Sequence, residues 1–381
     1  MILRILYTHS SSLIGGGNKV LLRLLDRLDR NRFEPFSVVP EHGPLESELK
    51  DRKIPYLVLD LRPRSCNLLS TATILTRLRW YIIRHGIDIL HANDPFTYRL
   101  ASVATKGSNN CMARICHLHH PEMSSQSIRW SFARQPNLVL TPTKFVRDQV
   151  CDWMGVKDTS FVHVVGNPVD VEWFSPPLIV EEVRRRVGID VVGPHVTIIG
   201  ALAPHKGHDC FFRMASILLQ SIPTVTFHVI GSAQTGDKEW AAQLRQMVHD
   251  LNIANSVRFW GFLPDEQVRD VLCASDLFVL PTKVEGFCLA VAEAQACGVP
   301  VLTSAIQPLD EVVKDGETGW LLPQGDFQEF ARRALELLTM SIKRRSFAAA
   351  ARRFVMHNFS QAVFAERIMG HYEAISGLLK K

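Results

Sequence analysis

The stretch LFVLPTKVEGFCLAVAEAQACGVPVLTS, residues 277–304, decides the fold of this 381-residue chain. It opens with an apolar run, Leu277–Leu280, that predicts a buried strand. A nearly uncharged segment of helical length follows, and a second apolar run, Val299–Thr303, predicts the next strand. A strand, a crossover helix and another strand form a βαβ unit, which places the two strands parallel in one sheet.

The same alternation of short apolar runs and longer amphipathic segments extends in both directions. Residues 168–177 interrupt it with three prolines, which neither a helix nor a central strand accommodates. We therefore expect a linker there, with one domain over residues 1–175 and another over residues 176–359. Before the linker, strands are predicted at Ile2–Thr8, Pro35–Val39, Tyr56–Leu59, Ile87–His91, Ala113–His117, Leu138–Thr141 and Phe161–Val165. After it, they are predicted at His195–Ile199, Thr226–Ile230, Val257–Trp260, Leu277–Leu280 and Val299–Thr303.

Composition narrows the class of protein. Apolar residues make up 46% of the chain, but no run of 18 uncharged apolar residues occurs, so no transmembrane helix is expected. The first residues do not read as a signal peptide. Eight cysteines without C-x-x-C spacing are typical of thiols in a reducing compartment, so a cytoplasmic location is expected, with peripheral contact at the inner membrane face left open.

The net charge of +5 is unevenly distributed. Residues 1–180 hold 22 basic against 16 acidic residues, whereas residues 181–381 hold 21 against 22. This asymmetry fits an anionic partner for the first half, such as a membrane surface, a lipid-phosphate acceptor or an acidic glycan, and ordinary variation in surface charge explains it equally well. A basic and aromatic run, formed by Arg77, Arg79, Trp80, Tyr81 and Arg84, fits either membrane contact or a packed helix with a solvated face.

Two glutamates and a glycine in the central stretch are the strongest chemical signal. Glu285 follows an expected strand, Gly286 comes next, and Glu293 lies about two turns into the expected helix. Glycine lets N–H groups at a helix N-terminus approach an anion closely, and carboxylates accept hydrogen bonds from sugar hydroxyls. The alternative is a capped helix with solvated glutamates, but a surface helix would carry more charge than this one. The pattern therefore favours a site for a diphosphate and sugar.

Residues 274–326 resemble the donor-binding half of retaining GT-B-type glycosyltransferases of the large family four, also called glycosyl transferases group 1. The shared features are a strand ending in Pro-Thr, the Glu-Gly-Phe block, a glutamate eight positions on, an Ala-Cys-Gly-Val-Pro-Val turn and a Gly-Trp-Leu strand. The resemblance implies that Glu285 contacts the donor sugar and Glu293 the ribose. It also implies that sugar and diphosphate are held by the backbone amides of Gly286, Phe287, Cys288 and Leu289.

A second element, GALAPHKGH at residues 200–208, lies between an expected strand and an expected helix. Lys206 in this position can neutralise charge on a departing diphosphate, although a lone lysine at a helix start is more often simply exposed. The family pattern often has arginine where this chain has Ala201. Phosphate stabilisation is therefore expected to depend more on Lys206, or on another residue such as His205.

Two elements of the first half complete the predicted site. A glycine-rich turn, SSSLIGGGN at residues 10–18, follows the first strand, and the resemblance assigns Gly16 and Gly17 to donor binding. In the segment CHLHHPE, residues 116–122, the resemblance places a histidine near the reacting carbon of the donor; His119 is predicted, with His120 as the alternative. Zinc binding is not predicted there, because adjacent strand positions diverge.

Together these features predict an α/β protein of the GT-B fold, with two Rossmann-like domains whose parallel sheets face each other across a cleft. As in similar enzymes, the helix of residues 360–381 is expected to pack back on the first domain. The predicted activity moves a sugar from a nucleoside-diphosphate sugar to a hydroxyl acceptor, a glycan or a lipid-linked glycan; retention of configuration is implied by the resemblance. No Asp-x-Asp occurs, so neither a metal nor another cofactor is expected.

Other functions stay open at this stage. Ala201 would fit a sugar-nucleotide-binding subunit that is non-catalytic or depends on a partner. An epimerase or phosphorylase acting on sugar phosphates is a further alternative. A dehydrogenase is disfavoured because no G-x-G-x-x-G follows the first strand, and no nucleic-acid partner is expected because no binding motif accompanies the modest charge.

Overall fold

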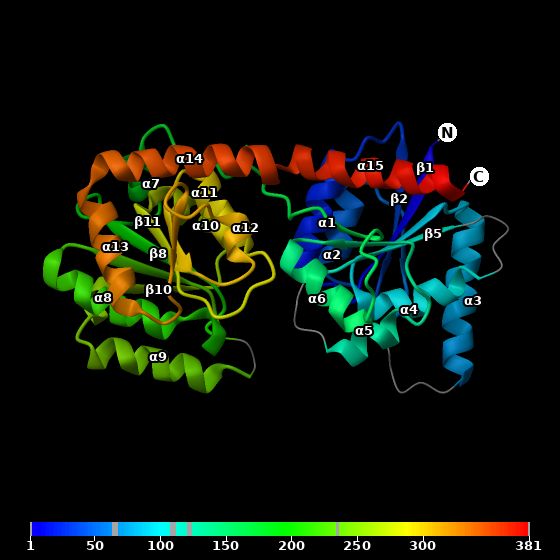
Figure 1. Cartoon of the computed structure of the whole chain (residues 1–381), viewed down its shortest axis with the longest axis horizontal. Coiled ribbons are helices and arrows are strands. Elements are labelled where there is room, and N and C mark those ends of the chain that lie inside the picture. The colour runs from blue at the N-terminus through cyan, green and yellow to red at the C-terminus, as the bar shows by residue number, and fades with distance from the viewer. Residues whose placement is uncertain (1, 63–67, 107–111, 120–123, 234–235, 380–381) are drawn as a thin grey trace. The chain divides into compact units, whose positions relative to one another are not determined.

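The computed structural model describes residues 2–62, 68–106, 112–119, 124–233 and 236–379. They form two compact units, one made of Met1–Pro168 with Gln361–Lys381 and the other of Val169–Ser360. Figure 1 shows a central sheet in each unit with helices packed around it. Every helix within these ranges is too short or too polar to cross a lipid bilayer.

The described part of the first unit contains a seven-stranded sheet in which all pairs are parallel. Its strand order is β3-β2-β1-β4-β5-β6-β7. Successive strands are added on one side of β1 and then on the other, so the strand order reverses between β1 and β4. Open parallel sheets bind ligands at such a reversal point. The strands are β1 (Leu3–Thr8), β2 (Phe33–Val39), β3 (Tyr56–Val58), β4 (Ile89–Ala92), β5 (Ala113–His117), β6 (Leu138–Thr141) and β7 (Val162–Val164).

The helices of the first unit follow from local sequence signals. In α1, Leu21, Leu22 and Leu25 lie on a buried face, as their helical spacing predicts. The start of α4 is fixed by the Asp94 side chain, which caps the helix, and by proline at the next position. The helices are α1 (Gly16–Arg27), α2 (Pro44–Asp51), α3 (Leu68–His85), α4 (Pro95–Ala104), α5 (Ser125–Ser131), α6 (Lys144–Met154) and α15 (Gln361–Leu379).

The second unit has, over its described residues, a six-stranded parallel sheet in the order β10-β9-β8-β11-β12-β13. Here the direction of strand addition reverses between β8 and β11, which places the expected ligand site after these two strands. The last strand was indicated only by the family resemblance and not by the apolar pattern. The strands are β8 (His195–Ile199), β9 (Thr226–Ile230), β10 (Val257–Gly261), β11 (Leu277–Leu280), β12 (Val301–Ser304) and β13 (Gly319–Leu322).

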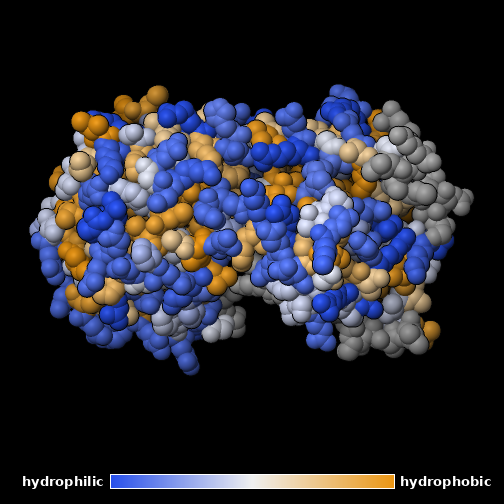
Figure 2. Space-filling model, viewed as in Figure 1, coloured by the Kyte–Doolittle hydropathy of each residue, from blue (hydrophilic) through white to orange (hydrophobic). Residues whose placement is uncertain are grey.

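One continuous apolar core holds the second sheet between its helices. The outer faces of these helices are polar, and in the face shown in Figure 2 hydrophilic side chains are interspersed with smaller hydrophobic areas over this unit. The helices are α7 (Val180–Arg186), α8 (His208–Ser221), α9 (Lys238–Asp250), α10 (Asp265–Ala274), α11 (Leu289–Ala296), α12 (Leu309–Val312), α13 (Phe327–Thr339) and α14 (Ser341–Phe359), with 3₁₀ turns at Pro204–Lys206 and Ala254–Ser256.

The division between the units falls after Pro168, so the boundary predicted at residue 175 was seven residues too late. The intervening residues belong to the second unit, because the Val169 amide donates to the Phe359 carbonyl at 2.7 Å and the Phe174 side chain is buried in the second core. The chain then returns to the first unit, where α15 packs against α1 and β5.

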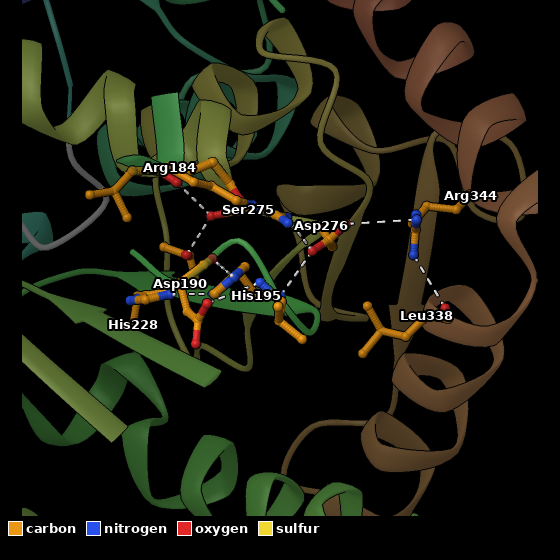
Figure 3. A network of polar contacts seen from close by, with 12 residues as sticks. Arg184, Asp190, His195, His228, Ser275, Asp276, Leu338 and Arg344 are labelled. Atoms are coloured by element: carbon orange, nitrogen blue, oxygen red, sulfur yellow. Dashed lines mark hydrogen bonds and ion pairs between the residues drawn. The ribbon is translucent and has the colours of Figure 1, made fainter. Parts of the chain in front are cut away.

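A polar network fixes the amino ends of β8 and β11, the edge opposite the expected ligand site (Figure 3). Arg184 forms an ion pair with Asp276 at 2.7 Å, and the same carboxylate accepts the backbone amide of His195 at 2.9 Å. The ring nitrogens of His195 and His228 lie 3.0 Å apart, and the Trp260 indole donates to His228 at 3.2 Å. Burial lowers the pKa of His228 to about 3 and lowers that of His195, which favours the neutral form of both rings.

Candidate active site

Two loops of the second unit meet where the strand order of its sheet reverses, between β8 and β11. One loop follows β8 and carries Lys206, and the other follows β11 and carries Glu285. The loops are joined at His205, whose carbonyl accepts the Thr282 hydroxyl at 3.0 Å and the Lys283 amide at 2.7 Å. Lys206 and Glu285 are thereby held against each other, although they are 79 positions apart in the sequence.

Gly207 makes this close approach of the two loops feasible. Its φ is +74°, and a Cβ atom there would lie only 1.9 Å from the carbonyl oxygen of Pro281. Any other residue would both adopt a disfavoured backbone conformation and clash with main-chain atoms. The Lys-Gly pair in the sequence therefore has a structural requirement at glycine and a chemical one at lysine.

Lys206 and Glu285 form an ion pair, with Nζ and Oε1 2.8 Å apart. The glutamate side chain is 8% exposed and the lysine side chain 21% exposed, so the pair is largely withdrawn from water. A lysine ammonium has three N–H groups, which lets it bond to Glu285 and to a phosphate oxygen at the same time. The pair thus places a fixed cation beside a carboxylate.

The turn after Glu285 leads into α11 through a strained residue. Cys288 has a φ of +72°, which non-glycine residues seldom adopt and which often marks a functional turn. Phe287 is buried and packs edge-on against Phe359 with 5.0 Å between ring centroids, so its side chain anchors the turn in the core. The Phe287 side chain is therefore not available to a ligand, and the binding role of the Gly286–Leu289 amides stays a prediction. Glu293 is half-buried on α11.

His208 belongs to the same corner but was not singled out from the sequence. It is fully buried at the start of α8, and neither of its ring nitrogens has a hydrogen-bond partner among the described residues. Burial, together with the nearby Lys206 and His205, lowers the pKa of His208 to about 4. A lone histidine after a Lys-Gly pair gives no sequence signal of such burial.

The first unit has a hollow of about 380 Å³ at its own reversal point, between the loops that follow β1 and β4. Its lining combines polar side chains with apolar surface from the exposed side chains of Leu13 and Phe96. The lining residues are Ser10, Ser11, Leu13, Gly15, Gly16, Gly17, Asn18, Asn93, Asp94, Pro95, Phe96, Leu118 and His119.

Three predicted residues, Gly16, Gly17 and His119, come together in this hollow. Gly17 lies so close to the imidazole that a Cβ atom would be 2.9 Å from Cδ2 of His119, whereas a Cβ at Gly16 would meet nothing within 4 Å. The alternative candidate, His120, lies outside the described residues.

Asn18, Asn93 and Asp94 also line the hollow and were missed from the sequence. Asn93 and Asp94 directly follow β4, and a polar pair after a buried strand was the available signal. The Asp94 carboxylate accepts the backbone amides of Ser10 and Thr97, each at 2.9 Å, which ties the two loops together. Burial raises its pKa.

The predicted site residues therefore fall into two groups, one in each unit. Lys206, Glu285 and the turn before α11 form the group in the second unit, and Gly16, Gly17 and His119 form the group in the first. In the part of the chain that the structure describes, no three His, Cys, Asp or Glu side chains are grouped so that they could hold a metal ion.

Two open parallel sheets, each with a polar site where its strand order reverses, define an α/β protein of the GT-B class. Two family models match consecutive parts of the chain: Glycosyltransferase Family 4 over residues 14–173 and Glycosyl transferases group 1 over residues 180–354. Together they account for most of the sequence. The chain belongs to the family 4 GT-B glycosyltransferases.

Curated relatives and solved structures agree with this family. The chain is 25% identical over 340 residues, 86% of each chain, to UDP-Gal:alpha-D-GlcNAc-diphosphoundecaprenol alpha-1,3-galactosyltransferase of Escherichia coli. It is 30% identical over 203 residues to D-inositol 3-phosphate glycosyltransferase of Thermomonospora curvata, a match over 51% of this chain that spans only about half (47%) of that relative. Anabaena Alr3699/HepE in complex with UDP has the same fold, with a TM-score of 0.85 at 21% identity over 98% of this chain and 100% of that chain.

Proposed function

We propose that this protein transfers a sugar from a nucleoside-diphosphate sugar to a hydroxyl acceptor with retention of configuration at the anomeric carbon. The observation that carries the proposal is the Lys206–Glu285 ion pair at the reversal point of the second sheet, beside the N-terminus of α11. A cation and helix N–H groups favour a diphosphate, and a buried carboxylate favours the hydroxyls of an attached sugar.

In the proposed reaction, the bond between the anomeric carbon and the diphosphate oxygen breaks, and a bond to the acceptor oxygen forms on the same face. The acceptor proton passes to the departing phosphate oxygen, so the products are the glycoside and a nucleoside diphosphate. Lys206 and the amides of residues 286–289 stabilise the charge that develops on the leaving group. Glu285 orients the donor sugar, and Glu293 binds the ribose.

In this proposal the hollow of the first unit receives the reacting end of the donor and the acceptor. Gly16 and Gly17 allow close approach to the donor, and His119 contacts its sugar near the reacting carbon. The expectation of a cleft between facing sheets stays a prediction. A partner-dependent or non-catalytic role is the second candidate, because Ala201 stands where the family often has arginine.

The donor screen that tests this function uses UDP-, GDP- and ADP-sugars with the purified chain. We expect one class to raise the melting temperature, since a ligand that binds only the folded state stabilises it. The UDP complex of the Anabaena structure and the UDP-Gal name of the E. coli relative support UDP-sugars as the first donors to try. Transfer or hydrolysis by the chain alone would exclude the non-catalytic alternative, and an inverted product, detected by proton NMR, would contradict retention.

We also propose that the acceptor is presented at an anionic membrane surface. Helix α3 contains no acidic residue, and Arg77, Trp80 and Arg84 are exposed, with the Arg84 guanidinium 4.9 Å from the Trp80 ring centroid. Basic and aromatic side chains on one helix favour binding to anionic headgroups. The diphosphoundecaprenol in the name of the E. coli relative supports a lipid-linked acceptor.

Co-sedimentation with vesicles tests this membrane contact. We expect the protein to bind vesicles that contain phosphatidylglycerol. Salt should weaken this binding, and so should the double substitution Trp80→Ser and Arg84→Ser. Equal binding to purely zwitterionic vesicles, or no binding at low salt, would contradict it.

A further inference from the structure

Asn93 is one of the polar residues that line the first unit's hollow. It directly follows β4, is 4% exposed, and has hydrogen-bond partners on both terminal atoms of its amide. Its Nδ2 donates to the carbonyl oxygen of Gly17 at 3.2 Å and to Oδ1 of Asn18 at 3.3 Å. Its Oδ1 lies 3.1 Å from Nε2 of His119.

The orientation of the Asn18 amide follows from its partners. Its Nδ2 contacts two backbone carbonyls, those of Ser11 at 2.9 Å and Leu13 at 2.7 Å, and a carbonyl only accepts hydrogen bonds. The other terminal atom of Asn18 must therefore be oxygen. It accepts from Nδ1 of His9 at 2.9 Å and from Asn93.

The Asn93 amide is oriented by the same reasoning. The terminal atom that faces the Gly17 carbonyl and the Asn18 oxygen meets two acceptors, so it must be the NH₂ group. The remaining atom is oxygen and accepts a hydrogen bond, which requires a proton on Nε2 of His119. A neutral His119 is then the Nε2–H tautomer, with the ring lone pair on Nδ1.

We infer that Asn93 is a positioning residue that fixes the proton of His119 on Nε2 and holds the imidazole against Gly17. One amide thereby joins the glycine-rich turn after β1 to the histidine after β5. The absence of a side chain at Gly17 lets the ring approach, because a Cβ there would lie 2.9 Å from the ring carbon. The effect on sugar transfer rests on the proposed function, whereas the tautomer is a property of the free protein.

Nitrogen-15 NMR of the imidazole rings in the free protein tests the inference without any donor. At a pH where His119 is neutral, the two-bond correlations should show the Nε2–H tautomer, with the signals assigned by their loss in His119→Gln. Asn93→Ala should give a mixture of tautomers. Asn93→Asp should keep Nε2–H, because the carboxylate still accepts there, but it loses the donor to Gly17 and Asn18. An Nδ1–H tautomer in the natural protein, or an unchanged tautomer in Asn93→Ala, would overturn the assignment.

Transfer kinetics provide the second readout. Asn93→Ala should lower kcat by roughly tenfold to a hundredfold with little change in KM, because the imidazole is no longer held in position. Thr97→Val is the matched control, since it removes the buried hydrogen bond between the Thr8 and Thr97 hydroxyls at the same sheet edge without touching the imidazole. A rise in KM with an unchanged tautomer would make Asn93 a substrate contact and overturn the positioning role. If neither the natural protein nor any variant transferred sugar while the tautomers were as expected, the result would contradict the proposed function and leave the inference about Asn93 intact.

Discussion

The two units place different chemistry at equivalent points of similar sheets. In the second unit the reversal point carries an ion pair, Lys206 with Glu285, and a glycine that lets two backbones touch. In the first unit the reversal point carries amides and an imidazole, and its carboxylate, Asp94, is engaged by two backbone amides. This difference fits the proposed function, in which the second unit holds the diphosphate of the donor and the first unit meets the hydroxyl groups that react.

Removing the cation tests the charged half of this comparison and should have the largest effect. Lys206→Ala should lower kcat/KM by roughly 30-fold to 1,000-fold, because the developing charge on the diphosphate loses its counter-charge. This loss corresponds to about 2–4 kcal/mol of transition-state stabilisation. Steady-state kinetics with the donor found by screening would measure the loss. Lys283→Ala is the matched control, because that lysine side chain is exposed in the neighbouring loop, which follows β11. Similar turnover of the two variants would remove Lys206 from the reaction.

A pair of glycine substitutions sharpens the first unit's half of the comparison. Gly17→Ala should destabilise the protein by about 1–3 kcal/mol, because the added methyl group meets the His119 ring, which Asn93 holds in place. Gly16→Ala should change the free energy of unfolding by less than about 0.5 kcal/mol, since that methyl group meets nothing within 4 Å. Urea denaturation of both variants measures the difference. Equal losses would mean that the turn does not pack against the histidine as described.

Acid should weaken the second unit through its buried histidines. The folded-state pKa of His228 is about 3, below the ordinary value of 6.5, so the unfolded chain binds the proton first. For His228, the stabilisation is complete above pH 6.5 and declines by about 1.4 kcal/mol per pH unit as the pH falls toward 3, and His195 changes stability in the same direction. His228→Gln keeps groups that can accept from Trp260 and donate to His195. It removes one group that binds a proton on unfolding, so it should lower the dependence of stability on pH by the share of one proton. An unchanged slope in denaturation curves between pH 7 and 5 would contradict the neutral pair.

Chelation should have the smallest effect. In the proposed reaction, Lys206 and the amides before α11 supply positive charge to the leaving group, so we expect turnover in excess EDTA to stay within about twofold of the untreated enzyme. Adding back Mg²⁺ or Mn²⁺ is the control. A loss in EDTA that either ion restores would show that a metal shares the charge of the diphosphate.

Much of the fold could be predicted because both sheets are parallel and buried, which makes their strands continuous apolar runs. Five predicted strands, among them Ala113–His117 and Leu277–Leu280, match the structure at both ends. The last strand, Gly319–Leu322, was visible only through the family resemblance because it is four residues long and begins with glycine. The boundary was misplaced because two of the three prolines, Pro176 and Pro177, lie after Val169, where the chain pairs with Phe359.

The candidate site was predictable where chemistry and local sequence coincide. Glu285 and Lys206 each follow a strand and flank a glycine, and the structure brings them within 2.8 Å. The position of Asn93 after a strand was a usable signal, but the roles of Asn93 and His208 were not predictable, because they depend on which side chains surround them after folding. The environment of His208 comes from residues of the β8 loop that no periodicity reveals.

A crystal structure with a bound nucleoside-diphosphate sugar tests the central claim most directly. We predict that Nζ of Lys206 lies within hydrogen-bond distance of a diphosphate oxygen, that Glu285 accepts from a hydroxyl of the donor sugar, and that the 286–289 amides face the ligand. A diphosphate bound elsewhere, with the Lys206–Glu285 pair intact and without ligand contacts, would contradict the account.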